Sequence, residues 1–390
     1  MKICFICSEY PPGPHGGIGT MTQVLSRSLS DAGHEVSTIG VYPEKYPGND
    51  DDSDGNIRIR RVRDSGGRFR WAWLRMRLYR EVAEQVRRGA IDVVEAPDYQ
   101  GWVAGWKALP APLVVRLHGS ETYFAAELGR RVNQMAFRLE RASLRRADAW
   151  FSVCRYTADK TRALFRLGTQ ASAILYNPVE IPSLPDHSIR SAKRVVFSGT
   201  LTPKKGVISL IRAWPRVVAA SPGSELHVYG KDGRTQTGGS MRMFLEEQLG
   251  AAHGSVHFHG HVGREKLFEA FLGARAAVFP SYAEAFAVAP LESMACECPT
   301  IYSRRGSGPE LLTDGKQGLL VDPDKPEEIA SAIVRVLGDD NFARHLGQAA
   351  RAHVIEKFST RTLVRQNVDA YEQVLQQFHA AQRPHTAIAI

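Results

Sequence analysis

Residues 194–206 read RVVFSGTLTPKKG, an apolar run that leads through a glycine to two adjacent lysines. The run is rich in β-branched residues and the segment after it is amphipathic, so the sequence predicts a strand, a short loop and a helix. Similar alternations of short apolar runs and longer amphipathic segments recur along the whole chain. This pattern is typical of βαβ units and predicts an α/β fold with parallel sheets.

The expected strands fall into two groups, one in each half of the chain. They are expected at 2–7, 35–40, 57–62, 92–96, 113–118, 150–153 and 172–176, and at 194–198, 225–229, 256–259, 276–280, 299–303 and 318–321. A chain of 390 residues is too long for one ordinary core. We therefore expect two doubly wound, Rossmann-like domains that face a cleft. They are residues 1–182 and residues 183–359, with a proline-rich linker at 178–193 and an amphipathic C-terminal helix at 360–380.

Composition and cysteine usage favour a soluble protein of the cytoplasm. The chain is 43% apolar and 23% charged, and no run reaches the 18 or so apolar residues of a membrane span. Five cysteines argue against a disulfide framework, and Cys4 and Cys7 fall within an expected buried strand. The run Asp50-x-Asp52-x-Asp54 resembles a calcium loop, but Arg61 occupies the twelfth position. We therefore expect no metal, and a solvated polar loop at 49–55.

The formal net charge of +9 is unevenly distributed. Eleven arginines lie between Arg58 and Arg88, and a second basic stretch spans 130–166. Such stretches favour an anionic partner, namely a membrane surface, a phosphate-bearing acceptor or a nucleic acid. A merely solvated basic face explains them equally well.

Ligands of doubly wound sheets bind where loops follow the carboxyl ends of strands. Gly16, Gly17 and Gly19 stand in the first such loop, where the backbone could approach a phosphate or sugar at a helix N-terminus. A dinucleotide fingerprint would need a third glycine where Thr22 stands, and strand 35–40 ends without an acidic residue. Both features argue against an NAD-dependent oxidoreductase.

Three further loops carry candidate site residues. In 198–206, Lys204 and Lys205 could bind a diphosphate, although solvated lysines would look the same. His118 ends a strand and could project into the cleft or be structural.

The segment 280–295, PSYAEAFAVAPLESMA, gives the most specific signal. Pro290 is suited to the first helical position, which places Glu284 in the preceding loop and Glu292 in the first turn. The amides of residues 286–289 would then face an anion. The helix dipole alone could explain Glu292, but two glutamates flanking a loop of small residues predict a ligand site.

Together these loops resemble those of the retaining glycosyltransferases of family 4, also called group 1, which have the GT-B fold. The resemblance covers nearly the whole chain and is most specific at 194–322. The matching residues are Gly16-Gly17, His118-Gly119, Asn177-Pro178, 199–206, Gly230, Gly260, the E-x7-E of Glu284 and Glu292, Pro309-Glu310, Asp314-Gly315 and 318–321.

The resemblance implies that the C-terminal domain binds a UDP- or GDP-sugar and the N-terminal domain binds a saccharide or lipid-linked acceptor. It also implies that the final helix crosses back onto the first domain, and that neither metal nor cofactor takes part. The implied activity is hexosyl transfer in polysaccharide or glycolipid synthesis of the bacterial type, in the cytoplasm or at the cytoplasmic face of a membrane.

The resemblance also assigns individual residues. The catalytic candidates are His118, Lys205 and Glu284, and the further donor-binding candidates are Gly17, Gly199, Thr200, Lys204, Gly230, Phe286, Ala287, Val288, Ala289 and Glu292. By resemblance Lys205 binds the diphosphate, Glu292 binds the ribose, and Glu284 and His118 contact the donor sugar. Two positions depart from the family pattern. Thr200 stands where many members have an arginine, whose charge Lys204 could replace, and Ala287 stands where glycine is common.

Three other classes remain as alternatives. An NAD-dependent oxidoreductase shares the Rossmann units, a glycosidase could use the two glutamates, and a nucleic-acid binder would explain the arginines. The incomplete fingerprint, the presence of a phosphate-binding loop and the lack of a recognisable nucleic-acid module argue against them in turn.

Overall fold

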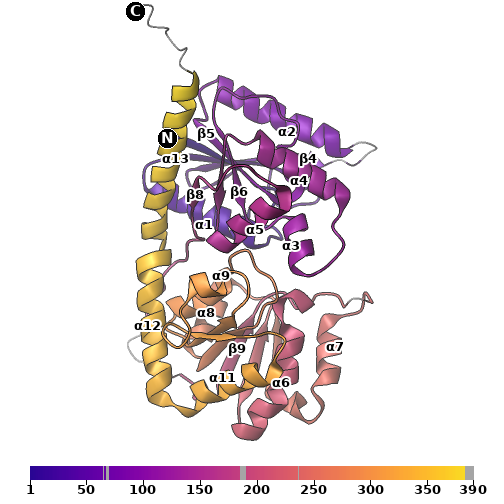
Figure 1. Cartoon of the computed structure of the whole chain (residues 1–390), viewed down its shortest axis with the longest axis vertical. Coiled ribbons are helices and arrows are strands. Elements are labelled where there is room, and N and C mark those ends of the chain that lie inside the picture. Colours follow the sequence, from indigo (N-terminus) through magenta and orange to yellow (C-terminus); the bar gives the residue numbers. More distant parts are fainter. Residues whose placement is uncertain (65, 67–69, 185–189, 236, 383–390) are drawn as a thin grey trace, which may run out of the picture. The chain divides into compact units, whose positions relative to one another are not determined.

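The computed structural model describes residues 1–64, 66, 70–184, 190–235 and 237–382. The chain forms two compact units, which are Met1–Pro178 with Thr360–Ile390, and Val179–Ser359 (Figure 1). The first unit therefore ends at 178 rather than at the expected 182. The reason is local, because Val179 forms a β-bridge with Ser359 and its amide donates to the carbonyl of Phe358 at 2.9 Å.

The first unit is built on an eight-stranded sheet with the order β3-β4-β2-β1-β5-β6-β7-β8. Its strands are β1 (Lys2–Ile6), β2 (Glu35–Pro43), β3 (Asp51–Asp54), β4 (Ile57–Asp64), β5 (Val93–Pro97), β6 (Leu113–Leu117), β7 (Ala149–Ser152) and β8 (Ala173–Ile174). Its helices are α1 (Gly17–Asp31), α2 (Arg70–Arg87), α3 (Glu121–Glu127), α4 (Gln134–Arg146), α5 (Arg155–Phe165) and α13 (Thr360–Gln382). All strand pairs are parallel except β3 with β4.

Alternation along β1 separates two hydrophobic cores. Cys4 and Ile6 pack in the core beneath α2, whereas Phe5 and Cys7 pack on the opposite face with α1 and α13. Cys4 and Cys7 therefore lie on different faces, and both thiols are buried and free. Cys4 thus lies within the buried strand β1, and Cys7 lies directly after its last residue.

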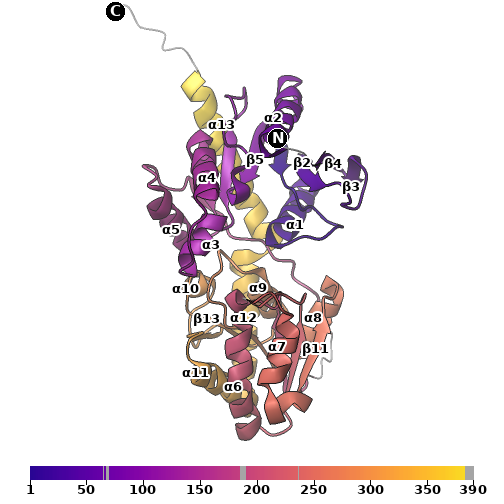
Figure 2. The ribbon, with the colours of Figure 1, turned by 90° about the vertical axis from the view of Figure 1, so that its right-hand side faces the viewer.

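The expectation of a polar loop at 49–55 is wrong, because residues Asp51–Asp54 form β3, which pairs antiparallel with β4 (Figure 2). Ion pairs hold the strand in place. Asp51 pairs with Arg60 at 2.5 Å, and Asp52 pairs with the buried Arg61 at 2.7 Å. Opposite charges on facing strands contribute to the pairing of β3, which itself has no apolar side chain, with β4. The arginines near residue 60 therefore have partners within the fold.

Helix α13 is fixed to the first unit by a buried polar network. The guanidinium of Arg116 on β6 pairs with the carboxylate of Glu95 on β5 at 2.7 Å, and both side chains are almost fully buried. Tyr371 of α13 donates its hydroxyl proton to Glu95 at 2.7 Å, and Asn367 accepts from Arg116 at 2.6 Å. Val374 packs in the core on the same face of the sheet. The C-terminal helix thus belongs structurally to the N-terminal half of the sequence.

The second unit is a six-stranded, entirely parallel sheet with the order β11-β10-β9-β12-β13-β14. Its strands are β9 (Arg194–Ser198), β10 (Glu225–Tyr229), β11 (Val256–Gly260), β12 (Ala276–Phe279), β13 (Thr300–Ser303) and β14 (Leu319–Val321). Its helices are α6 (Val207–Ala220), α7 (Met241–Gln248), α8 (Arg264–Leu272), α9 (Val288–Ala295), α10 (Gly308–Leu311), α11 (Pro326–Gly338) and α12 (Asp340–Phe358). Every strand expected from the sequence is present, with ends that differ by a few residues.

Candidate functional site

The strand order of the second unit changes direction between β9 and β12, which lie side by side. In open α/β sheets, ligands bind beyond the carboxyl ends of the strands at such a switch point. The loop after β9 carries Lys204 and Lys205, and the loop after β12 carries Glu284. The structure therefore brings the two most specific sequence signals to one end of one sheet.

Two glycines permit the close packing of these loops. At Gly206 φ is +70°, and a Cβ atom would lie 1.7 Å from the carbonyl oxygen of Pro280. At Gly230 φ is +146°, and a Cβ atom would lie 2.0 Å from the carbonyl oxygen of Gly199. The amide of Tyr282 also donates to the carbonyl of Lys204 at 2.8 Å, which joins the loop after β12 to the loop after β9. Any larger residue at the two glycines would force these loops apart.

Lys205 and Glu284 form the central ion pair of the site. The Nζ of Lys205 lies 2.6 Å from Oε1 of Glu284, whose side chain is buried. Burial alone would raise the pKa of Glu284, but Lys205 and Lys204 outweigh it and hold that pKa below its usual value. Glu284 is therefore ionised, and it holds the ammonium group of Lys205 in a fixed position. A positioned ammonium group is suited to binding a phosphate.

Helix α9 begins earlier than expected, at Val288 with Ala287 as its N-cap. Pro290 is therefore the third helical residue rather than the first, and Glu292 lies just beyond the first turn. Both predictions were wrong by the same two-residue shift. Proline is tolerated there because the first four amides of a helix have no intrahelical acceptor. The amides of Val288 and Ala289 carry the partial positive charge of this helix end, as required of an anion site.

The loop before α9 is anchored by an aromatic contact. Phe286 is buried, and its ring centroid lies 5.7 Å from that of Phe358. Ala285 and Ala287, on either side, are also buried. Phe286 therefore has a packing role that positions the loop backbone, and Ala287 fits in the place where glycine is common in the family.

Glu292 has a different partner from Glu284. Arg264, at the start of α8, lies 3.2 Å from Glu292 and 2.9 Å from Glu180. Burial raises the pKa of Glu292, and Arg264 only partly offsets the effect. Sequence reasoning did not find Arg264, because it lies on a different element, helix α8, and no local motif marks it. Thr200 is exposed, so a side chain larger than threonine would fit at the position of the family arginine.

In the first unit, His118 follows β6 and is held by Asp98, which follows β5. The backbone amide of His118 donates to Oδ1 of Asp98 at 2.8 Å. Burial, aided by the charge of Arg116, lowers the pKa of the His118 ring to about 3. Burial raises the pKa of Asp98 to about 7. The His118 ring is therefore neutral at physiological pH, and it can donate or accept a hydrogen bond but does not carry a positive charge.

In the glycine-rich loop after β1, a carboxylate of the protein lies at the helix N-terminus where the sequence predicted a phosphate or sugar. The amide of Gly19 donates to Oε1 of Glu9 at 2.8 Å, so a carboxylate of the protein already lies at this helix end. A Cβ atom at Gly19 would lie 2.1 Å from the carbonyl oxygen of Glu9, which gives this glycine a packing role. Gly17 has open space around its Cα. With Glu9 in place, this loop is better suited to hydroxyl groups than to a phosphate.

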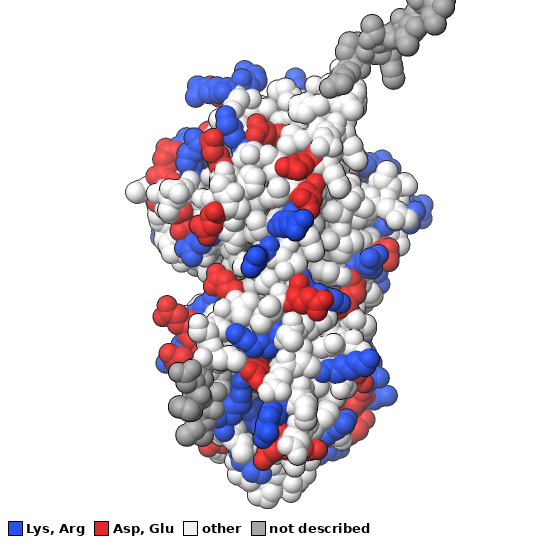
Figure 3. Space-filling view, turned by 90° about the vertical axis from the view of Figure 1, so that its left-hand side faces the viewer, with Lys and Arg blue, Asp and Glu red and all other residues white. Residues whose placement is uncertain are grey.

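The arginine-rich stretch of the first unit contains buried and exposed parts. Arg75 is buried and donates to backbone carbonyls of Gln100 and Gly101. Trp71, Trp73 and Met76 of the same helix are about half exposed, at 49%, 51% and 48%. Arg68 lies outside the described residues. Figure 3 faces away from the right-hand end of α2 in Figure 1, and on the side that it draws, basic and acidic side chains are interspersed. Helix α2 thus combines arginines with exposed aromatic rings.

Two family models match the chain and together cover most of it. The model described as Glycosyltransferase Family 4 matches residues 15–181, and the model described as Glycosyl transferases group 1 matches residues 186–353. The chain is a family 4 glycosyltransferase. This decides against the oxidoreductase and glycosidase alternatives.

Relatives and solved structures agree with this family and with the GT-B fold. The glycosyltransferase is 25% identical to a phosphatidyl-myo-inositol mannosyltransferase of Mycolicibacterium smegmatis, over 99% of each chain. It superposes on sucrose-phosphate synthase of Thermosynechococcus elongatus with a TM-score of 0.81 and 21% identity, over 96% and 99% of the two chains. It also superposes on HepE of Anabaena, solved with UDP and glucose, with a TM-score of 0.72 and 18% identity, over 96% and 100%. The GT-B prediction is confirmed.

Proposed function

We propose that this glycosyltransferase moves a hexosyl unit from a UDP- or GDP-sugar to a saccharide or lipid-linked acceptor, with retention of the anomeric configuration. The observation that carries the proposal is the Lys205–Glu284 pair beside the N-terminus of α9, at the switch point of the second unit. The HepE structure, which contains UDP and glucose, supports UDP as the first donor to test.

The proposed chemistry places the diphosphate leaving group at Lys205. As the bond between the sugar and the diphosphate breaks, negative charge develops on the diphosphate, and it is stabilised by Lys205, Lys204 and the first amides of α9. The acceptor hydroxyl attacks from the face that the diphosphate leaves, and its proton passes to the departing phosphate oxygen. No bond to a protein side chain forms in this step.

The remaining donor contacts follow from hydrogen-bonding capacity. Glu292 would accept hydrogen bonds from the ribose hydroxyls, and Glu284 from a hydroxyl of the sugar. We propose that His118, as a neutral imidazole, contacts the donor sugar, and that Gly17 lines the same site. Because cationic groups of the chain itself are assigned to the diphosphate, the proposed reaction needs no metal ion.

We further propose a lipid-linked acceptor at a membrane surface. Exposed tryptophans are typical of the lipid–water interface, and neighbouring arginines are attracted to anionic lipid. Trp71, Trp73 and Arg77 of α2 offer this combination. The mannosyltransferase relative, which is named for a phosphatidylinositol acceptor, supports the same choice. Among the described residues no helix has the length and apolarity to cross a bilayer.

A thermal-shift panel with UDP, GDP, NAD and an oligonucleotide tests the donor proposal. A ligand at about 100 times its dissociation constant adds roughly 2.7 kcal/mol to the free energy of unfolding. We expect a clear rise in Tm with UDP or GDP and none with NAD or the oligonucleotide. If no nucleoside diphosphate and no sugar ester of one shifts the Tm, the proposal is wrong. The anomeric configuration of the product, read by NMR from its coupling constant, tests retention separately.

A further inference from the structure

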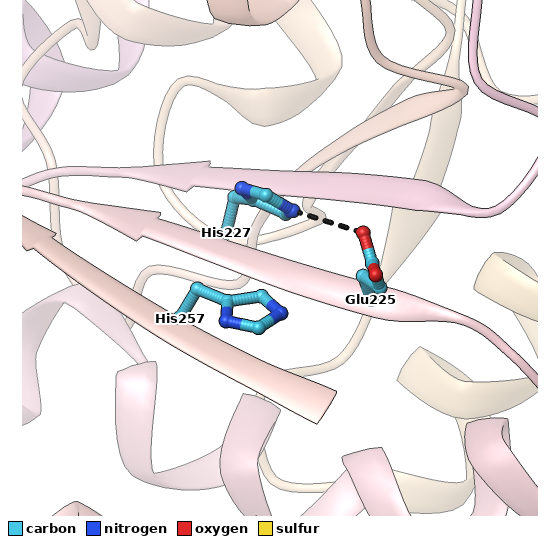
Figure 4. A group of neighbouring side chains, drawn as sticks. All are labelled: Glu225, His227 and His257. Atoms are coloured by element: carbon cyan, nitrogen blue, oxygen red, sulfur yellow. Dashed lines mark hydrogen bonds and ion pairs between the residues drawn. The ribbon is translucent and has the colours of Figure 1, made fainter. Parts of the chain in front are cut away.

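Away from the donor loops, the second unit carries a cluster of imidazole and carboxylate groups on its edge. Glu225 and His227 lie two residues apart on β10, and His257 and His259 lie two residues apart on the edge strand β11. His227 and His257 are direct partners in the parallel register. Because residues two apart in a strand share a face, all four side chains project from one face of the sheet. Figure 4 shows Glu225, His227 and His257 in this arrangement.

The spacing of three of these side chains suits a transition-metal ion. One ligand atom from each of Glu225, His227 and His257 lies within 4.8 Å of the other two. Zinc binds imidazole nitrogen and carboxylate oxygen at about 2.0–2.2 Å, which places ligand atoms of a tetrahedral site roughly 3.3 Å apart. Small side-chain rotations close this difference, and Glu225 is exposed and free to make them. Imidazole with carboxylate is an ordinary zinc ligand set.

The two nitrogens of His227 already have distinct partners. Its Nε2 lies 3.3 Å from the carboxylate of Glu225, and its Nδ1 lies 3.0 Å from Nε2 of His259. Metal-binding histidines commonly have the second nitrogen held by a hydrogen bond, which fixes the tautomer and the ring orientation. His259 is placed to accept the Nδ1 proton of His227. In this tautomer Nε2 of His227 has no proton and does not hydrogen-bond to the Glu225 carboxylate, so a cation between these two acceptors would bind both.

We propose that Glu225, His227 and His257 bind one Zn²⁺ ion, with His259 as the residue that orients His227. The ion would join β11 to β10 through side chains. Such a link stabilises an edge strand, which has hydrogen-bonding partners on one side alone. The zinc site is separate from the proposed donor site. Glu225 is the first residue of β10, whereas the donor-binding candidate Gly230 follows the last residue of that strand.

Zinc binding to the full chain, without a histidine tag, tests the proposal. Metal-free protein is titrated with Zn²⁺ against a chromophoric chelator, and the Tm is measured with Zn²⁺ and with EDTA. We expect one ion per chain and a higher Tm with zinc. His257→Ala should abolish this binding, and His259→Gln should weaken it by about 10- to 100-fold. His345→Ala removes an exposed histidine of α12 and should change nothing.

The comparison in EDTA separates lost binding from lost folding. With EDTA, the Tm of His257→Ala should match that of the wild type, and sugar transfer by the wild type should continue undiminished. The proposal is overturned if His257→Ala binds zinc as the wild type does, or if His345→Ala loses it equally. Loss of transfer in EDTA would overturn the structural role of the ion. Neither result depends on which donor sugar the enzyme uses.

Discussion

Lys205 lies in the loop after β9 and Glu284 lies in the loop after β12, yet their charged atoms are 2.6 Å apart. The contact exists because β9 and β12 are neighbours in the sheet, although β10 and β11 lie between them in the sequence. Glu284 is buried, so its carboxylate needs a cation, and Lys205 is thereby held in place before any ligand arrives. A cation that is already oriented stabilises developing charge without reorganisation during the reaction.

Replacement of Lys205 tests this role. Lys205→Ala should lower the turnover number by a factor on the order of a hundred or more, because one lost electrostatic donor costs about 3–4 kcal/mol. Steady-state transfer assays at saturating donor measure the effect. Lys357→Ala, which removes an exposed lysine near the end of α12, is the control and should retain full activity. An unchanged rate in Lys205→Ala would refute the assignment.

The two packing glycines give a second prediction. Gly206→Ala and Gly230→Ala should each lower the Tm and abolish the Tm shift with UDP, because the new methyl group would overlap a carbonyl oxygen of a neighbouring loop. Gly223→Ala is the matched control, since φ there is +79° but nothing lies within 4 Å of the added atom. Its cost should be limited to backbone strain of about 1 kcal/mol. If all three variants behave alike, strain rather than loop packing explains the glycines.

Sequence patterns predicted the strands well because each is a short, locally apolar run that is buried in the sheet. They failed at β3, where Asp51 and Asp52 have no hydrophobic period and depend on Arg60 and Arg61 of the next strand. That pairing is visible only once the hairpin is formed. The sequence signal for this hairpin was a polar run followed by a glycine and then by an arginine-rich strand.

Site residues were predictable to the extent that they lie in loops directly after strands. Lys205 and Glu284 could be found separately, but their contact depends on the strand order, which no local pattern encodes. Arg264 was missed because its partner Glu292 lies on another helix, 28 residues away. Glu9 was missed although it is only ten residues from Gly19, because no local motif marks a carboxylate that accepts from this helix end. The start of α9 was misplaced because proline is compatible with several positions of a first turn, so Pro290 alone did not fix the register.

Asp98 predicts a dependence of stability on pH. Its pKa rises from 3.8 to about 7 on folding, chiefly through burial. Between these values the folded protein holds a proton that the unfolded chain has released, so this group's contribution falls as pH rises from about 4 to about 7. Asp98→Asn keeps an oxygen acceptor for the amide of His118 and removes the titration. The variant should therefore gain stability relative to the wild type as pH rises through this range.

Urea unfolding at several pH values measures this difference. The lowered pKa of His118 contributes a slope of the opposite sign, because there the unfolded chain binds the extra proton. Comparison of Asp98→Asn with the wild type cancels that contribution. Asp159→Asn, an exposed aspartate of α5, serves as the control. A pH slope in Asp98→Asn identical to that of the wild type would contradict the prediction.

Binding to anionic lipid is the consequence expected from the surface of α2. Trp71 and Trp73 expose about half of their surface beside arginines, so insertion at the interface and attraction to anionic headgroups should act together. Cosedimentation with vesicles should require anionic lipid and weaken with salt, and the double variant Trp71→Ser, Trp73→Ser should bind several-fold less. Met243→Ser removes an exposed apolar side chain of α7 and should bind as the wild type does. Equal binding to neutral vesicles, or no binding to any, would show that the arginines of this helix serve only as a solvated surface.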